Sequence, residues 1–305
     1  QHLETIAKLN QLTTVELENK KKIWVQLLYT EREKRSKPRL DDKCLTSWNA
    51  IMLKGYVDAF KALGNQDYLD TALENANFII KKLWSNEGNL FHSYKNGKNS
   101  INGYLEDYCF VIAAFIALYE VTFEEKWLLD AKQLTDYTLE HFYDEQQAFF
   151  RFTSDKDEAL ISVHFETEDN VIPASNSVMA KNLYQLSIYF DNSYYEKVAK
   201  QMLTILLPNI DYPSAYSNWL DLALTISEQN KELAICGPNA KEVNKISMGL
   251  YFPNVIIAGT EKPSHLPFLK DRFVEDKTLF YVCQNKTCQL PTEDFQEVIN
   301  QLSLK

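Results

Sequence analysis

Carboxylates that occur in closely spaced pairs are the residues of this sequence with the clearest chemical use. Three segments carry such a pair, each at or just before the expected start of an apolar helix, where the helix dipole favours negative charge. A capping role explains each carboxylate singly, but one cap needs only one carboxylate. Two carboxylates across a cleft, about 5–9 Å apart, can cleave a glycosidic bond. The catalytic candidates are Asp42, Glu106, Asp107 and Asp169.

Asp107 is expected to matter most among these groups. It follows Glu106 and precedes Tyr108 in the first turn of the most apolar helix of the chain, so its surroundings should be dry and its ionisation sensitive to them. Whether the group binds or catalyses stays open at this stage.

Polar and aromatic residues near the same turns are candidates for contact with a substrate. Flat aromatic faces suit the apolar faces of sugar rings, and a buried amide needs a hydrogen-bond partner. His92 and His164 are the histidines nearest these turns, and a sugar epimerase needs a base that removes a proton beside a carbonyl. The substrate-binding candidates are Trp48, Asn49, Tyr108, His164, Glu166 and Asn176.

The cysteines point to a reducing compartment and to no metal site. Their number is odd, and two of the five lie within strongly apolar segments, so a cytoplasmic location is expected. Cys283 and Cys288 have no second Cys or His pair to complete a zinc site, and two reduced thiols flanking a turn are the expected state. One glycine after an apolar run is no Gly-rich phosphate-binding fingerprint, and no organic cofactor is expected.

Two kinds of helix must position these groups. Residues 67–84, 124–142 and 194–207 are amphipathic, whereas 48–63 and 104–119 are apolar nearly all round and require burial on both sides. The alternation, which recurs at about sixty residues, predicts an inner and an outer layer of paired helices, an α/α toroid or an α-solenoid. The starts of the inner helices should share one rim, which carries Trp48, Tyr108 and Asn176.

The two ends of the chain follow other patterns. Residues 4–33 predict one long charged helix, whereas 233–238, 255–259 and 279–282 are short apolar runs typical of strands. We expect these strands to form one sheet, parallel where a helix connects them. The predicted domains are an α/α-hairpin toroid over 1–230 and a small α/β subdomain over 231–305.

Composition excludes two classes of partner. The net charge of −10 would repel phosphate backbones and anionic lipid, so nucleic acid and membrane surfaces are not expected partners. The longest apolar run, 109–119, is much shorter than the roughly 20 residues that span a bilayer. The chain opens with Gln1 and a charged helical pattern, without the features of a secretory signal.

Four ordered motifs carry a resemblance to a known family. They comprise the string from Arg39 through Trp48-Asn49, the segment 103–108, the segment 173–177, and Cys283 with Cys288 and Pro291. With these motifs the chain resembles the C-terminal part of the spermatogenesis-associated protein 20-like, thioredoxin domain-containing family. The resemblance implies a mainly α fold, an incomplete α/α toroid similar to six-hairpin glycosidases and acylglucosamine 2-epimerases. It also implies a substrate-binding role for Arg39.

Three functions remain open from the sequence. The leading hypothesis is a carbohydrate-binding or carbohydrate-processing toroid that uses its rim carboxylates on a small sugar-like ligand. The second, from another class, is a non-catalytic helical scaffold that partners a thioredoxin-like domain in cis or in trans. The third is an isomerase similar to sugar 2-epimerases. Whether the chain is a glycoside hydrolase-like or an epimerase-like enzyme is therefore undecided here.

Overall fold

The computed structural model describes residues 2–158, 161–228, 230–252 and 254–302, and the chain divides into two compact units, 1–42 and 43–305.

The first unit holds α1 (Leu3–Leu9) and α2 (Thr14–Glu33), so the expected single helix over 4–33 is wrong. Gln11 takes the left-handed conformation, with φ of 55°, just after α1 ends. Thr13 then starts a new helix, because its hydroxyl accepts the Glu16 N–H (3.2 Å) while the Glu16 carboxylate accepts the Thr13 N–H (2.8 Å).

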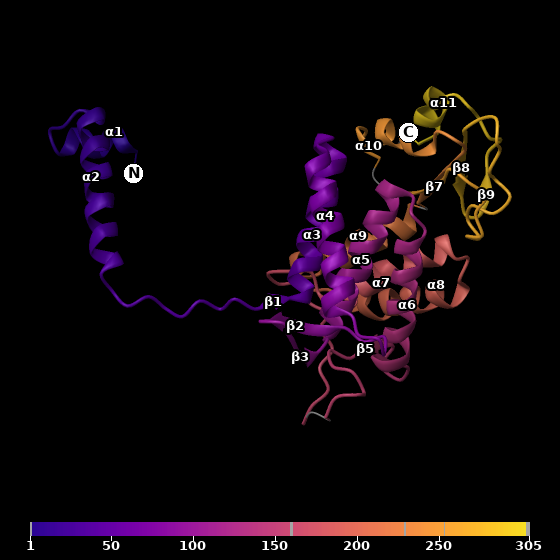
Figure 1. The fold of residues 1–305 in the computed structure, drawn as a ribbon, viewed down its shortest axis with the longest axis horizontal. Coiled ribbons are helices and arrows are strands. Elements are labelled where there is room, and N and C mark those ends of the chain that lie inside the picture. The colour runs from indigo at the N-terminus through magenta and orange to yellow at the C-terminus, as the bar shows by residue number, and fades with distance from the viewer. Residues whose placement is uncertain (1, 159–160, 229, 253, 303–305) are drawn as a thin grey trace. The chain divides into compact units, whose positions relative to one another are not determined.

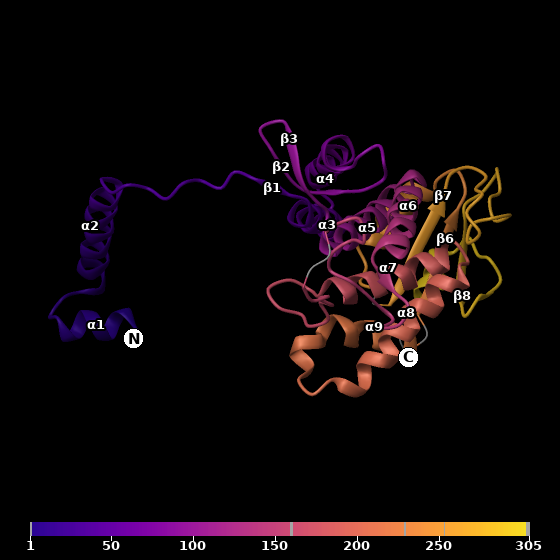
Figure 2. The ribbon, with the colours of Figure 1, turned by 90° about the horizontal axis from the view of Figure 1, so that it is seen from below.

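Inner and outer helices alternate in the second unit, as predicted. Figure 2 shows α5 between α3 and α7, with α4 and α6 outside this row. The inner helices are α3 (Thr46–Leu63), α5 (Leu105–Thr122) and α7 (Ser175–Tyr189). The outer helices are α4 (Gln66–Phe78, continued by the π-helical turn Ile79–Leu83), α6 (Lys126–His141) and α8 (Ser193–Leu206, continued by the 3₁₀ turn Leu207–Asn209). Helix α9 (Ser217–Ser227) follows them, preceded by the 3₁₀ turn Pro213–Tyr216.

Helix α5 is the centre of the hydrophobic core. All of its residues are buried except Glu106, Ala113 and Glu120. It packs against α3, α6 and α7, which explains why its sequence is apolar nearly all round. The outer helix α4 buries only the stripe formed by Leu69, Ala72 and Ala76, and its other residues are partly or fully exposed.

The starts of the three inner helices lie at one end of the second unit. The Ser47 N–H at the start of α3 donates to the Asp107 carboxylate at the start of α5 (2.9 Å). The Asn182 amide of α7 donates to the Cys109 carbonyl in the next turn of α5 (2.7 Å). The predicted common rim is therefore confirmed for the turns that carry Trp48, Tyr108 and Asn176.

Short strands that the sequence analysis did not predict precede the inner helices. Strands β1 (Cys44–Leu45), β2 (Phe91–Lys95) and β3 (Lys98–Asn102) form an antiparallel sheet that leads into α3 and α5, and Ser93 pairs with Ser100 in its register. Strands β4 (Tyr143–Asp144) and β5 (Phe149–Phe150) form a hairpin between α6 and α7.

The predicted tail strands form one sheet with the order β7-β6-β8-β9. Strands β6 (Lys231–Cys236) and β7 (Val255–Thr260) are parallel and joined by α10 (Ala240–Met248), as expected for a helical connection. Strand β8 (Leu279–Gln284) is antiparallel to β6, because the chain returns from β7 through turns. The short β9 (Thr287–Cys288) and α11 (Phe295–Leu302) complete the tail.

Cys283 and Cys288 form a disulfide bond, so the expectation of two reduced thiols is wrong. The β8–β9 hairpin places the two residues directly opposite one another, with their Cα atoms 3.9 Å apart. The other three cysteines are free, as expected: Cys44, Cys109 and Cys236.

The tail sheet packs against the C-terminal ends of the inner helices (Figure 1). The Tyr119 hydroxyl at the end of α5 lies 3.3 Å from the Gly259 nitrogen in β7, and the Tyr189 hydroxyl at the end of α7 donates to the Ile257 carbonyl (3.0 Å). Residues 43–305 accordingly form one compact unit, and the boundary at residue 230 stays a prediction.

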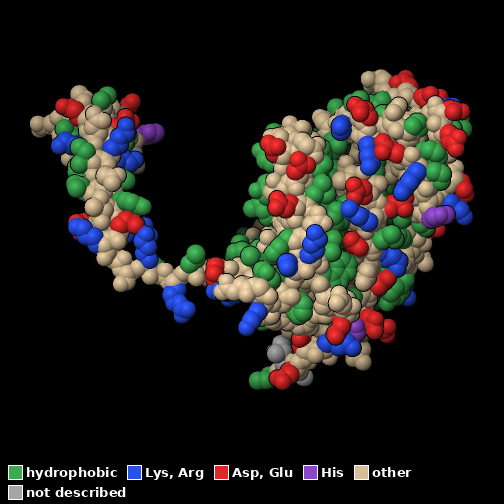
Figure 3. Space-filling view, in the orientation of Figure 1, with side chains coloured by type: hydrophobic (Ala, Val, Ile, Leu, Met, Phe, Trp, Pro, Cys, Tyr) green, Lys and Arg blue, Asp and Glu red, His purple; other side chains and the backbone are tan. Residues whose placement is uncertain are grey.

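Charged side chains of both signs are interspersed on the face of the second unit seen in Figure 3. Within the described residues, no helix combines the length and the apolar character that crossing a bilayer requires.

Gly259→Ala should loosen the contact between the tail and α5. A Cβ at residue 259 would lie 2.2 Å from the Phe123 ring, so we expect a loss of roughly 1–3 kcal/mol in the free energy of unfolding. Urea denaturation followed by circular dichroism measures this change. Gly55→Ala is the control, because its Cβ meets nothing within 4 Å and alanine favours the helix by about 0.5–1 kcal/mol. Equal stability of the two variants would contradict the packing described.

Candidate functional site

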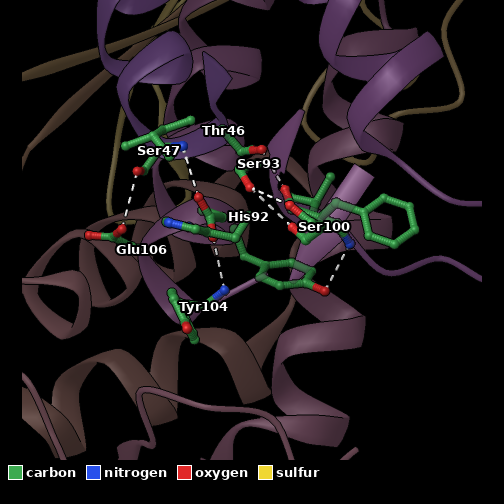
Figure 4. Close-up of polar contacts among 12 residues, drawn as sticks. Thr46, Ser47, His92, Ser93, Ser100, Tyr104 and Glu106 are labelled. Atoms are coloured by element: carbon green, nitrogen blue, oxygen red, sulfur yellow. Dashed lines mark hydrogen bonds and ion pairs between the residues drawn. The ribbon is translucent and has the colours of Figure 1, made fainter. Parts of the chain in front are cut away.

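The Asp107 carboxylate joins three elements at the rim. It is fully buried in the first turn of α5. Its Oδ1 accepts the Ser47 N–H from the start of α3, and its Oδ2 accepts the Tyr104 N–H from the residue before α5, both at 2.9 Å. Figure 4 shows Ser47, Tyr104 and Glu106 grouped at this point with His92. A buried carboxylate needs such donors, because without them its charge would be costly.

His92 is the third donor to Asp107. It lies in β2, and its Nδ1 is 3.0 Å from Asp107 Oδ2, while its ring is 4.8 Å from the Tyr104 ring. The hydrogen bond to Asp107 raises the pKa of His92 above its ordinary value, against the opposing effect of burial. The bond occupies Nδ1, so Nε2 is the nitrogen left to exchange a proton with a ligand.

Glu106 is the neighbour of this pair and is half-buried. It accepts a hydrogen bond from the Ser47 hydroxyl at 3.2 Å. Burial raises the pKa of Glu106, and the negative charges of Asp107 and Glu166 raise it further. A carboxyl group whose pKa is raised holds its proton to a higher pH than an ordinary glutamate does, which makes Glu106 a candidate proton-exchanging group.

The side chains of His92, Glu106 and Asp107 lie close enough to share a cation. One ligand atom from each falls within 4.8 Å of the others. Three of the roughly four lone-pair sites of the Asp107 carboxylate already accept N–H groups, so Asp107 has little capacity left for a metal ion. Zinc sites usually use three or four protein ligands, so a metal ion at this cluster would compete with the hydrogen bonds of Asp107.

The start of α7 adds Glu166 to the rim. Its Oε2 accepts the Ser175 N–H at 3.1 Å, and its charge acts on Glu106. The Ser175 hydroxyl is buried and has no hydrogen-bond partner among the described residues. A buried polar atom of this kind normally has a partner, which makes it a candidate for contact with a ligand or an ordered water.

Three of the predicted site residues are engaged in structural contacts. The side-chain amide of Asn176 makes two hydrogen bonds to the backbone of Phe150. Its oxygen accepts the Phe150 N–H (2.8 Å), and its nitrogen donates to the Phe150 carbonyl (2.9 Å). Tyr108 is fully buried and stacks on Tyr137, with ring centroids 5.4 Å apart. Asp169 accepts backbone N–H groups at the starts of both α7 and α9, each at 2.9 Å.

The remaining predicted residues lie at the surface or in the first unit. Trp48 is 65% exposed next to Ser47, and His164 is exposed with its ring 6.0 Å from the Phe152 ring. The Asn49 amide donates to the Leu45 carbonyl at 2.8 Å, which stabilises the first turn of α3. Two residues belong to the first unit, and their roles stay predictions: Arg39 and Asp42.

The sequence pattern locates His92 less well than the other site residues, because nothing in the pattern joins this possible base to Asp107. The signal that could have placed it is Asn96-Gly97, a typical two-residue hairpin turn, which here takes φ of 51° and 79°. The hairpin brings β2 beside β3, and β3 leads directly into α5. His92 therefore arrives next to the first turn of that helix.

The fold and this rim define a class of protein, the α/α toroids. The chain resembles a GH76 α-mannanase of Bacteroides thetaiotaomicron with a TM-score of 0.51 and 16% identity, over 76% of this chain and 66% of the mannanase chain. It also resembles a cellobiose 2-epimerase of Bacillus thermoamylovorans with a TM-score of 0.46 and 16% identity, over 54% and 43%. The predicted fold class is confirmed, and the structural neighbours are carbohydrate-processing enzymes.

In sequence, the chain is similar to human spermatogenesis-associated protein 20, with 29% identity over 88% of this chain. The protein of the same name from Rattus norvegicus is 28% identical over the same share. The predicted resemblance is therefore confirmed. The chain spans 37% of the length of these relatives. No protein-family model matches it.

Asp107→Asn should lower both the stability of the protein and the pKa of His92. An amide cannot accept all three N–H groups, so one buried donor loses its partner, and we expect a loss of roughly 1–3 kcal/mol in the free energy of unfolding. The pKa of His92 should fall because the bond that raises it is weakened. Proton NMR titration of the histidine ring measures this pKa. Asp155→Asn, beside His141, is the matched control and should leave His92 unchanged. An unaltered His92 titration in Asp107→Asn would contradict the pairing.

Proposed function

We propose that the second unit is a carbohydrate-processing domain that transfers protons on a sugar at the rim. Glu106 acts as the base and His92 as the acid, and Asp107 is a positioning residue that keeps His92 protonated. The observation that carries this proposal is the buried Asp107–His92 hydrogen bond of 3.0 Å beside Glu106, whose pKa burial raises.

The proposal takes Glu106 as a carboxylate and His92 as an imidazolium over an intermediate pH range. This is the ordinary order of the two pKa values, both of which are raised here. The carboxylate can remove a carbon-bound proton beside a carbonyl while the imidazolium donates a hydrogen bond or a proton to the carbonyl oxygen. Such a pair serves an isomerase or an epimerase of reducing sugars.

The chemical types of the two groups favour proton transfer over glycoside hydrolysis. Hydrolysis usually uses two carboxyl groups, whereas this pair is a histidine and a glutamate whose ligand atoms lie within 4.8 Å of each other. Sugar as the substrate class is supported by the toroid shared with an α-mannanase. The exposed ring of Trp48 at the same rim offers a face on which a sugar could stack.

Deuterium exchange tests this proposal whichever product the reaction forms. In D₂O, the protein should catalyse deuterium incorporation at C2 of one or more free aldoses, detected by proton NMR. Glu106→Gln and His92→Gln should each lower this rate on the order of 10²- to 10⁴-fold, because each removes one proton-transferring group. Glu124→Gln, an exposed change on the second unit, should retain the full rate.

The outcomes separate the rival functions. Release of reducing ends from oligosaccharides without C2 exchange would replace the proposal with a hydrolase. A parent protein that binds no sugar and exchanges no proton would favour the scaffold that partners a thioredoxin-like domain.

The pH dependence of the exchange rate should be bell-shaped and displaced upward. The rate should rise as Glu106 loses its proton, at a pH above its ordinary pKa of 4.5. It should fall as His92 loses its proton, at a pH above its ordinary pKa of 6.5. A rate profile from pH 4 to 9 in the parent protein measures both limbs. A rate that climbs steadily through neutral pH would contradict the assignment of His92 as the acid.

A further inference from the structure

The Cys283–Cys288 disulfide lies at the other end of the second unit from the rim and plays no part in the chemistry proposed there. It joins β8 to β9 across a two-residue turn, Asn285-Lys286, in which both residues take positive φ, 51° and 63°. A lysine is strained in this conformation, so the crosslink holds together a turn that the sequence alone disfavours.

Arg272 contacts both sulfur atoms. One guanidinium nitrogen lies 3.3 Å from Cys283 Sγ, and another lies 3.3 Å from Cys288 Sγ. The guanidinium itself is held over the rings of Phe268 (4.8 Å) and Tyr281 (5.2 Å). A fixed positive charge beside two sulfurs would stabilise either of them as a thiolate.

The two sulfurs differ in their accessibility. Cys283 is 1% exposed, whereas Cys288 is exposed. Cys288 and Arg272 also line a cavity of about 400 Å³ between α7 and the tail sheet, which includes Tyr184 and Glu232. A small thiol can therefore reach Cys288 through this cavity, whereas buried Cys283 is not among the residues that line it.

We propose that Cys283–Cys288 is a redox centre that dithiols reduce, that Cys288 Sγ is the atom attacked first, and that Arg272 stabilises the departing thiolate. Two features go beyond what holding the hairpin requires. Cys288 is exposed, and the Arg272 guanidinium contacts both sulfur atoms. The exchange depends on thiolate character and on access, and the described contacts supply both.

The reaction has two steps. A thiolate of the dithiol attacks Cys288 Sγ, the Cys283–Cys288 bond breaks, and its electron pair leaves on Cys283 as a thiolate beside Arg272. The second thiol of the reagent, after losing its proton, attacks the reagent sulfur of the mixed disulfide and releases Cys288. Two electrons pass from the dithiol to the protein, the dithiol leaves as its own disulfide, and its two protons go to solvent or to the cysteines.

Single-cysteine variants of the full chain test the order of attack. Cys283→Ser leaves Cys288 free, and Cys288→Ser leaves Cys283 free, so their reaction with 5,5′-dithiobis(2-nitrobenzoate) reports the access to each sulfur. The variant with both substitutions keeps only the other three cysteines, and its reaction rate is subtracted as background. We then expect Cys288 to react on the order of tenfold faster than Cys283. Equal rates, or a faster Cys283, would overturn the proposal.

Arg272→Gln, added to Cys288→Ser, tests the role of the guanidinium on the departing sulfur. In Cys288→Ser the pH dependence of the reaction gives the pKa of Cys283, and Arg272→Gln should raise this pKa because the positive charge beside the sulfur is lost. Arg272→Lys keeps the charge and should give a smaller rise. An identical pKa in all three proteins would remove Arg272 from the mechanism.

The parent protein supplies a test that does not depend on any substitution. Purified without reductant, it should show Cys283 and Cys288 protected from iodoacetamide by peptide mass mapping, and dithiothreitol should expose both. Two alkylated cysteines before reduction would show that the bond does not form and would end the proposal.

Discussion

The structure of the rim depends on one buried carboxylate. Asp107 accepts N–H groups from Ser47, Tyr104 and His92, which belong to α3, to the turn before α5 and to strand β2. A carboxylate removed from water is stable only when its charge is compensated, so these donors are held in place by the cost of losing them. The carboxylate thus fixes the spacing of two inner helices and the orientation of the His92 ring together.

The same constraint accounts for the chemistry available at the rim. Burial and the neighbouring negative charge raise the pKa of Glu106, while the hydrogen bond to Asp107 raises that of His92. Both groups therefore hold their protons to a higher pH than they ordinarily do, which is the property that the proposed proton transfer uses. In the proposed reaction Asp107 acts on the protonation of His92, through the hydrogen bond that raises the pKa of that histidine.

At the opposite end of the second unit, side-chain hydrogen bonds join the inner helices to the tail sheet. There the inner helices end against the tail sheet, and tyrosine hydroxyls such as that of Tyr189 bond the backbone of β7. The sheet in turn presents Arg272 and the disulfide beside a cavity next to α7. The proposed proton chemistry and the proposed redox chemistry thus lie at opposite ends of the second unit, and each can be tested without disturbing the other.

The sequence by itself determined the alternation of inner and outer helices and the three main tail strands, because hydrophobic periodicity reports burial directly, as in the apolar α5 and the amphipathic α4. It also indicated Glu106 and Asp107 as a pair. Only the tertiary structure decided that His92 bonds to Asp107, because a hydrogen bond between residues 15 positions apart leaves no periodic signal in the sequence. The Cys283–Cys288 bond likewise depends on strand register, since a shift of one residue would have turned the two side chains to opposite faces.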